Sequence, residues 1–383
     1  MKIPFALPDI GQEEIDEVID CMKSGWVTTG ARTNKFEDDF SKYIGCTHAL
    51  AVNSATSGLH LALDAIEISR GDKVIVPVNT FTSTAEVVRY FDADPIFCDI
   101  DSSTFNISIT SLEKILSTHS ERMKIRAIMP VHIAGQACEM DEINELARKY
   151  NVKVIEDAAH ALPTTYKGSL VGTLSDITVY SFYATKTLCT AEGGMVVTDN
   201  DDYKKRIKVM RLHGFNRDAW NRYNSSKPAW FYEIVAPGFK YNMPDLAASM
   251  GIHQLAKADL FLNRRNEIAG MYNEAFKDLE KIKTPFIKRK SDVHSFHLYI
   301  LKVPKRNEFI KKMSKKGIGT SVHFIPLHIQ PYWKEKYNLS ESDFPVAMEN
   351  FNSIMSLPIY TKLTDEEVHE IINAVKETYE EII

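Results

Sequence analysis

Strand-like and helix-like segments alternate through the first half of the chain. The strand-like runs are short, rich in β-branched and aliphatic residues, and each is followed by a stretch with apolar residues at helical spacing. They lie at 49–53, 73–77, 95–100, 125–131 and 152–156. Because parallel neighbours cannot be joined by a tight turn, this alternation predicts parallel strands connected by right-handed crossover helices. We therefore expect an α/β sheet with helices on both faces.

Two of these strands carry chemically distinctive side chains at their carboxyl ends, where open α/β sheets bind ligands. The run at 152–156 leads to Asp157, and an apolar run starting at Ile177 passes into a hydroxyl-rich turn that carries Lys186. A glycine pair at 193–194 then precedes another strand-like run. Desolvation between apolar strands lowers the pKa of a lysine, so its amine becomes a nucleophile able to form a Schiff base. For this loop alone, a solvated surface lysine is the simpler interpretation.

A carboxylate opposite such a lysine is what pyridoxal phosphate needs, because it keeps the pyridine nitrogen protonated and lets the ring accept electrons. Asp157 and Lys186 therefore form a candidate pair for this cofactor. Residues 53–60 pass from a strand into a helix and place Thr56 and Ser57 at the helix N-terminus. Unpaired N–H groups and the helix dipole favour phosphate there, although the same residue types also serve as simple helix caps.

An aromatic residue, Phe81, follows the strand at 73–77. An aromatic ring at this end of a strand can stack on a flat cofactor, or it can belong to the core. Beyond these strands, a long helical pattern runs from Leu246 to about Phe276. Short strands and helices follow it, which predicts a smaller α+β unit at the C-terminal end.

Composition excludes several classes of protein. The 383 residues are 44% hydrophobic and 25% charged, which is ordinary for a globular enzyme, and the net charge of −5 argues against a nucleic-acid binder. Five widely spaced cysteines without a CxxC pair predict neither a disulfide framework nor a metal site. No apolar run has the length of a signal peptide or of a membrane span. We expect a cytoplasmic protein that binds neither nucleic acid nor membrane.

Three motifs carry a resemblance to a known family: EDAAHA at 156–161, SFYATK at 181–186 and EGG at 192–194. In this order they resemble the DegT/DnrJ/EryC1/StrS sugar-nucleotide aminotransferases, and the resemblance extends over nearly the whole chain. It implies the fold type I of pyridoxal phosphate-dependent transferases. That fold has a large domain with a mixed, mostly parallel seven-stranded sheet and a smaller α+β C-terminal domain. We expect the large, cofactor-binding domain at 1–250, and the linking helix with the small domain at 251–383.

The resemblance also implies roles for individual residues. Lys186 would form the Schiff base and move the proton, and Asp157 would face the ring nitrogen. Further cofactor contacts are expected on the ring, the ring oxygen and the phosphate, from Phe81, His160, Thr56, Ser57 and Ser181. Asn242 would reach the phosphate of the neighbouring subunit, which implies a homodimer with shared active sites.

Substrate contacts are expected from three segments. Trp26 and Thr28 lie in a glycine-bounded loop that the resemblance places at the substrate mouth. The segment 322–328 carries His323 and His328, although a structural role is the simpler interpretation of either histidine alone. An irregular run contributes the last candidates, which are Arg211, His213 and Arg217. Many aminotransferases bind the donor carboxylate with a late arginine that has no recognisable counterpart here, so Arg211 or Arg217 is the hypothesis for that role.

The implied reaction transfers an amino group from L-glutamate to a keto sugar linked to a nucleotide. C4 of a UDP-, dTDP- or GDP-4-keto-6-deoxy sugar is expected, in cell-surface polysaccharide or O-antigen biosynthesis, and amination at C3 is the near alternative. Dehydratases of the family carry histidine in place of the lysine, so Lys186 argues against that activity. A desulfurase would need a catalytic cysteine, for which only Cys189 lies near. A non-catalytic regulator on the same fold is the alternative from another class.

Overall fold

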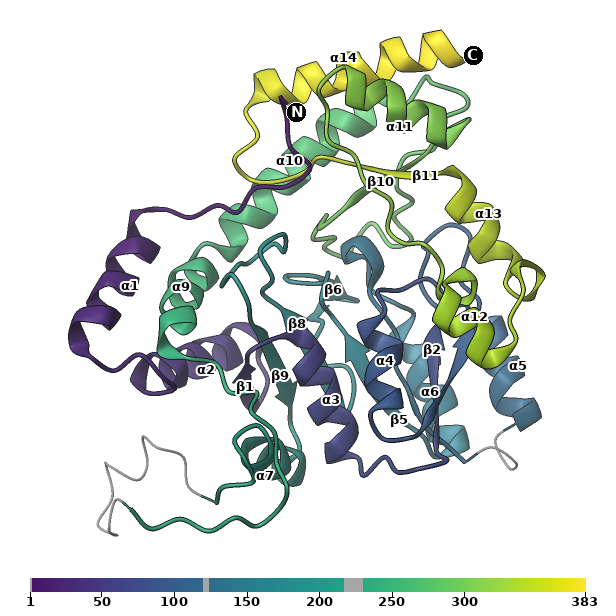
Figure 1. Cartoon of the computed structure of the whole chain (residues 1–383). Coiled ribbons are helices and arrows are strands. Elements are labelled where there is room, and N and C mark those ends of the chain that lie inside the picture. Colours follow the sequence, from purple (N-terminus) through teal and green to yellow (C-terminus); the bar gives the residue numbers. More distant parts are fainter. Residues whose placement is uncertain (1, 120–123, 217–229) are drawn as a thin grey trace.

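The computed structural model of the chain describes residues 2–119, 124–216 and 230–383 (Figure 1). In this part of the chain seven strands form one sheet with the order β1-β9-β8-β5-β4-β2-β3. All neighbours from β8 to β3 pair in parallel, whereas β9 is antiparallel to both β8 and β1. The strands are β1 His48–Val52, β2 Lys73–Pro77, β3 Asp94–Cys98, β4 Ile125–Ile128, β5 Lys153–Asp157, β8 Ile177–Ser181 and β9 Gly194–Thr198. The predicted mixed, mostly parallel sheet is confirmed.

Helices cover both faces of this sheet, as the alternation predicted. Successive residues of β2 point to opposite faces, so Val74 and Val76 belong to the buried cluster that includes Leu59 of α3, whereas Ile75 belongs to the cluster on the other face that includes Phe40 of α2. Burial on both sides explains why the strands are continuously apolar rather than alternating. One face carries α3 Ala55–Ala65, α4 Ser83–Arg89 and α7 Asp201–Met210, and the other carries α2 Ala31–Ile44, α5 Ile109–His119 and α6 Met140–Tyr150.

A smaller α+β unit lies above the carboxyl ends of the parallel strands (Figure 1). Its antiparallel pair, β10 Tyr299–Lys302 and β11 Ile354–Leu357, shares a separate core with α10 Ala258–Phe276, α11 Arg306–Lys315 and α14 Asp365–Ile382. The N-terminal segment joins this unit, because Ile3 forms a parallel bridge with Ile318. Two further helices, α12 Pro331–Tyr337 and α13 Pro345–Ser353, pack beside β3.

The long helical pattern after Leu246 is not one helix. It divides into α9 Asp245–Ala256 and α10 at Lys257, whose backbone N–H bonds to the carbonyl of Gln254, three residues back. Lys257 Nζ also forms an ion pair with the buried carboxylate of Glu14 in α1 Gln12–Ser24. The break lets α9 pack on α1 and α2 while α10 crosses to the smaller unit.

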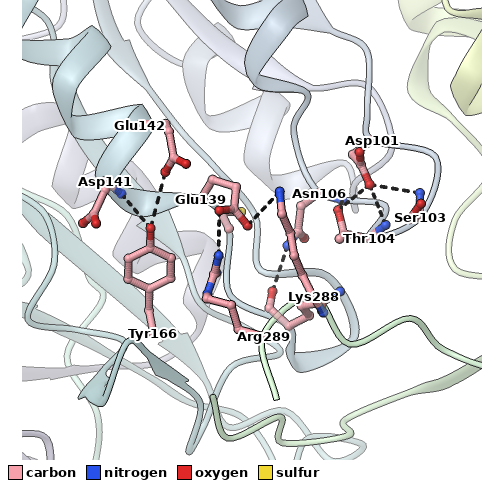
Figure 2. A network of polar contacts seen from close by, with 12 residues as sticks. Asp101, Ser103, Thr104, Asn106, Glu139, Asp141, Glu142, Tyr166, Lys288 and Arg289 are labelled. Carbon is pink, nitrogen blue, oxygen red and sulfur yellow. Dashed lines mark hydrogen bonds and ion pairs between the residues drawn. The ribbon is translucent and has the colours of Figure 1, made fainter. Parts of the chain in front are cut away.

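The segment between α10 and β10 is held against the large sheet by a network of polar contacts (Figure 2). Arg289 is its centre: Nη1 lies 2.7 Å from Glu139 Oε2, and Nε lies 2.7 Å from Asp292 Oδ2. Its guanidinium also lies 4.4 Å from the ring centre of Tyr166, in the short hairpin of β6 Thr165–Tyr166 and β7 Ser169–Leu170. These contacts fix the segment that leads into the active-site region.

Among the helices that the structure describes, none combines the length and the apolar composition needed to cross a bilayer. The same described residues contain no group of three or more His, Cys, Asp or Glu side chains placed to hold a metal ion.

Candidate active site

A cavity of about 470 Å³ opens at the carboxyl ends of the parallel strands, between the large sheet and the smaller unit. The turns after β2, β5 and β8 and the start of α3 form its floor, as the position of ligand sites in open α/β sheets predicts. The smaller unit forms the opposite wall with His297, Leu298, His323, Phe324 and Ile359.

Asp157 and Lys186 both line this cavity. Asp157 is the last residue of β5 and is buried; its Oδ2 accepts a 2.7 Å hydrogen bond from Thr84 Oγ1, and its Oδ1 accepts one of 3.1 Å from the N–H of Ala159. Burial raises the pKa of the Asp157 carboxyl, and these donors together with Lys186 partly offset the rise. Burial lowers the pKa of Lys186 to about 8, although the Asp157 carboxylate opposes this shift. A substantial fraction of the lysine is therefore an uncharged amine near neutral pH.

The N-terminus of α3 lies at one end of the cavity, where its unpaired N–H groups and the helix dipole would favour an anion. Ser54, Ala55 and Thr56 line it, and Ser54 caps the helix by accepting a 3.1 Å hydrogen bond from the N–H of Ser57. The first strand residue opposite, Gly194, lies so close that a Cβ there would be 2.8 Å from the backbone nitrogen of Ala55. Only a residue without a side chain allows β9 to close this end.

The expected hydroxyls differ in their placement. Thr56 and Ser181 line the cavity. Ser57 does not, because its Oγ is buried 2.7 Å from both Asn53 Oδ1 and the carbonyl of Ser54, to which its single O–H donates, and it accepts a 3.2 Å hydrogen bond from the N–H of Ser54. The structure therefore supports only the helix-cap alternative for the Ser57 hydroxyl and leaves Thr56 and Ser181 as candidates.

Phe81 and His160, the residues expected to contact the cofactor ring, both line the cavity. Phe81 lines the cavity and is 57% exposed, so a face of its ring is free to stack on a ligand. His160 is buried, and its Nδ1 accepts a 3.3 Å hydrogen bond from the N–H of Ala134, which puts its proton on Nε2. Burial, with help from Lys186 and His323, lowers the pKa of His160, so this imidazole is neutral.

His323 also lines the cavity. Its Nδ1 lies 2.9 Å from Ser356 Oγ, and its ring stacks on Phe5 with centroids 5.3 Å apart. Burial lowers the pKa of His323 to about 4, and Lys186 adds to the effect. His328 is different: it is fully buried beside Phe344, with neither ring nitrogen hydrogen-bonded among the described residues. The structure does not bring His328 to the cavity, because its side chain packs beneath the wall.

Arg211 and His213 also lie away from the cavity of the chain that carries them. Arg211 is 4% exposed and its Nη1 bonds to the Glu37 carboxylate and to the carbonyl of Ala51, so its charge is used inside the fold. This geometry does not support a substrate role for Arg211. Exposed His213 packs on Phe215. Arg217 lies outside the described residues.

The loop residues Trp26, Thr28 and Asn242 cluster together. Trp26 Nε1 donates a 3.2 Å hydrogen bond to the carbonyl of Thr29, whose Oγ1 accepts a 2.6 Å hydrogen bond from Asn242 Nδ2. The backbone N–H of Asp245 bonds to the carbonyl of Thr28 in the same cluster. None of the three lines the cavity of the chain that carries it.

Several cavity residues were not found from the sequence. Phe5 and Ala6 come from the N-terminal segment, and Thr80 comes from the turn after β2. His297 precedes β10, where the strand pattern gives a histidine no special status. Their positions depend on the packing of distant segments, so no local signal marks them.

The cavity fits pyridoxal phosphate on observations that are independent of one another. A lysine amine with a lowered pKa faces it, a buried carboxyl closes its floor, and Phe81 offers an aromatic face. Gly194 leaves room for an anion against the N-terminus of α3. This fold and this site define a pyridoxal phosphate-dependent transferase of fold type I.

Comparison with known proteins identifies the family. The model of the DegT/DnrJ/EryC1/StrS aminotransferase family matches residues 8–376, and the chain belongs to this family. Its members depend on pyridoxal phosphate, and the chain is a pyridoxal phosphate-dependent aminotransferase. The resemblance seen in the sequence motifs is confirmed.

Curated relatives match the chain from end to end. An uncharacterized protein of Methanocaldococcus jannaschii is 49% identical over 99% of this chain and 98% of its own. The spore coat polysaccharide biosynthesis protein SpsC of Bacillus subtilis is 44% identical over 98% of this chain and 96% of its own.

Solved structures agree with these relatives. A Streptococcus pneumoniae protein assigned as a sugar aminotransferase, solved in its PMP form, superposes with a TM-score of 0.91 at 34% identity, covering 100% of both chains. PseC of Helicobacter pylori, an aminotransferase involved in the biosynthesis of pseudoaminic acid, gives 0.91 at 27% identity over 100% of both chains.

Proposed function

We propose that this enzyme moves an amino group from L-glutamate to a keto sugar linked to a nucleotide, at C4 of a UDP-, dTDP- or GDP-4-keto-6-deoxy sugar. The observation that carries the proposal is the pairing of Lys186 with Asp157 in one cavity. The relatives support the sugar class, because one serves polysaccharide biosynthesis and another is assigned as a sugar aminotransferase. Amination at C3 is the second candidate, since the same cofactor residues serve either carbon.

Each residue of the pair has a distinct task. When bound, pyridoxal phosphate supplies the carbon that receives the amino group and a ring that withdraws electrons from it. The Lys186 amine holds the cofactor and, once released, carries the proton to and from the reacting carbon. The Asp157 carboxylate keeps the ring nitrogen protonated by electrostatics rather than by proton transfer.

We further propose that two chains complete each active site. Asn242, Trp26 and Thr28 lie together outside their own cavity, as expected of residues that serve a partner subunit. A homodimer in which Asn242 reaches the phosphate of the partner's cofactor gives this cluster a role.

The five cysteines are free and buried, which supports a reducing compartment such as the cytoplasm.

The proposal is tested first by absorption spectroscopy. Purified protein supplied with pyridoxal phosphate should show the visible band of the lysine-bound cofactor, L-glutamate should bleach it, and Lys186→Ala should lack it. A panel of nucleotide-linked keto sugars should then restore the band, and NMR of the product should place the amine at C4. Product aminated at C3 would select the second candidate, and a band indifferent to every amino donor would refute the proposed function.

A further inference from the structure

His297 occupies a fixed position on the wall of the cavity that belongs to the smaller unit. Ser295 Oγ donates a 2.8 Å hydrogen bond to the carbonyl of His160, and the N–H of Leu298 bonds to the carbonyl of Ala134. Gly135 permits this close approach: its φ is +101°, and a Cβ there would lie 2.1 Å from Ser295 Oγ. The residues on both sides of His297 are therefore tied to the carboxyl ends of the large sheet.

The imidazole of His297 has no hydrogen-bond partner among the described residues. It is 6% exposed and lies against the ring of His160, with centroids 4.3 Å apart. Nδ1 is buried without a partner. Nε2 is not fully buried, and no described residue forms a hydrogen bond with it. A buried N–H without an acceptor is more costly than a buried bare ring nitrogen with the same surroundings, so we place the proton on Nε2, where the ring keeps access to the cavity.

A second unusual group lies directly behind this ring. Arg265 of α10 is 4% exposed, and its Nη1 donates to the carbonyls of Phe296, His297 and Ile359, at 3.1, 3.4 and 2.8 Å. These backbone carbonyls, and no carboxylate, are its partners among the described residues, and its Nε has none. Burial lowers the pKa of Arg265 to about 10, so the guanidinium is still charged at neutral pH.

The charges around His297 thus favour an anion. Burial lowers the pKa of His297, and His160, Lys186, Arg265 and His323 contribute. The imidazole is therefore a neutral N–H donor that has two cationic side chains nearby, Lys186 in the cavity and Arg265 within the wall. A sugar hydroxyl would gain a hydrogen bond from this donor but nothing from the uncompensated arginine. A carboxylate gains from both, since an ion in a site of low dielectric is stabilised by every nearby opposite charge.

We propose that His297, with the Arg265 guanidinium behind it, forms the subsite that binds a carboxylate of the amino donor. This inference rests on the proposed function and supplies the carboxylate contact for which the sequence offered only Arg211 and Arg217. His297 touches the donor, whereas Arg265 acts through the backbone of the wall and through its charge.

The test compares two substitutions at this position with one matched control. His297→Gln keeps an N–H donor near the position of Nε2, and His297→Phe keeps the ring shape without a donor. His294→Phe is the control, because His294 is equally buried three residues earlier, its Nδ1 accepts from the N–H of Phe296, and it does not line the cavity. Each protein is loaded with pyridoxal phosphate, and the cofactor band verifies loading and folding.

Single-turnover bleaching by L-glutamate gives the half-saturating donor concentration and the maximal rate separately. His297→Phe should raise the half-saturating concentration about 10- to 100-fold with little change in the maximal rate, the loss expected for one hydrogen bond to a charged group. His297→Gln should restore most of the affinity, and His294→Phe should resemble the wild type. An unchanged half-saturating concentration in His297→Phe, or an equal rise in His294→Phe, would overturn the proposal.

Calorimetry supplies a readout that does not depend on turnover. The loaded wild type should bind glutarate about 10-fold or more tightly than the uncharged glutaramide, and His297→Phe should lose that preference. A preference that survives in His297→Phe contradicts the subsite. If L-glutamate bleaches the wild-type band but His297→Phe behaves like wild type, this inference alone fails; if no amino donor bleaches the wild-type band, the proposed function fails with it.

Discussion

Thr84 Oγ1 donates a 2.7 Å hydrogen bond to Oδ2 of Asp157, and the hydroxyls of Thr84 and Thr80 are themselves joined at 2.8 Å. All three side chains are buried. Thr84 lies in the first turn of α4, four residues after Thr80, and their bonded hydroxyls lie on one side of the turn that follows β2. They reach across to the end of β5 and hold the carboxylate in one orientation. The Asp157 carboxylate is therefore positioned in the cavity by a neighbouring segment as well as by its own strand.

Thr84→Val removes this donor while preserving the side-chain shape. The Asp157 carboxylate then loses one of its two hydrogen-bond donors and its pKa rises further, so it holds the ring nitrogen less firmly. We expect the dissociation constant of pyridoxal phosphate to rise about 10-fold, as for one lost hydrogen bond to a charged group. Fluorescence titration measures this dissociation constant. Thr198→Val, which loses a buried hydroxyl bond to the carbonyl of Asp176 at the other end of the sheet, should not change it; equal effects of both variants would contradict the role of Thr84.

Attachment of the cofactor should depend on pH through Lys186. Only the uncharged amine attacks, and the pKa of Lys186 is lowered to about 8. The rate of band formation, measured by stopped-flow absorbance, should rise with pH and reach half its maximum near pH 8. Because the Asp157 carboxylate raises the pKa of Lys186, Asp157→Asn should move this midpoint to lower pH. A midpoint near that of an ordinary lysine would show that the amine is not desolvated in solution.

The buried pair of His132 and Glu156 should make stability depend on pH. His132 Nε2 lies 2.8 Å from Glu156 Oε2, and both side chains are fully buried. Burial opposes charge on His132, and so does the 3.0 Å hydrogen bond that its Nδ1 accepts from the N–H of Cys138, but its contacts with the Cys138 side chain and with Glu156 raise the pKa of the imidazole to about 10. A raised pKa stabilises the folded state fully below the ordinary histidine pKa of about 6.5, and this stabilisation is lost as the pH rises through about 10.

Glu156→Gln therefore provides the test of this pair. It should lower the free energy of unfolding by about 3 kcal/mol at pH 6, because a buried cation loses its partner. The difference in the free energy of unfolding between this variant and the wild type should become smaller as the pH rises from 6.5 to 10. Guanidinium unfolding followed by circular dichroism at several pH values measures it. Glu370→Gln removes an exposed partner of Lys2 and should be nearly neutral throughout; a difference for Glu156→Gln that stays constant with pH would contradict the charged pair.

Arg211→Met should affect stability rather than donor binding. The Glu37 carboxylate, which is largely buried, would lose its cation, so we expect a loss of about 3 kcal/mol in the free energy of unfolding. The half-saturating concentration of L-glutamate should stay unchanged in the protein that remains folded and loaded. Arg206→Met, which breaks a more exposed pair with Asp64, should cost less. A selective rise in the half-saturating concentration would return Arg211 to the substrate site.

Local sequence determined the sheet and the centre of the site. The strand and helix patterns depend on side-chain periodicity within short segments. Asp157 is the last residue of one strand and Lys186 lies in the turn after another, so their motifs specify both residue and position. The position of the α3 N-terminus could be predicted from the sequence for the same reason, although the Ser57 hydroxyl caps the helix in the structure. The boundary at residue 250 stays a prediction.

The tertiary structure decided which polar side chains face the cavity. His294, His297 and His328 are all buried, yet only His297 lines it, because the smaller unit is tied to the ends of β4 and β5 through segments distant in the chain. The role of Arg211 could not be predicted from the sequence either, because its ion-pair partner Glu37 lies far away along the chain. The periodicity of apolar residues determines which segments form strands and helices and which of their faces are buried. Whether a single side chain points into the cavity depends instead on contacts between segments that meet only when the two units pack together.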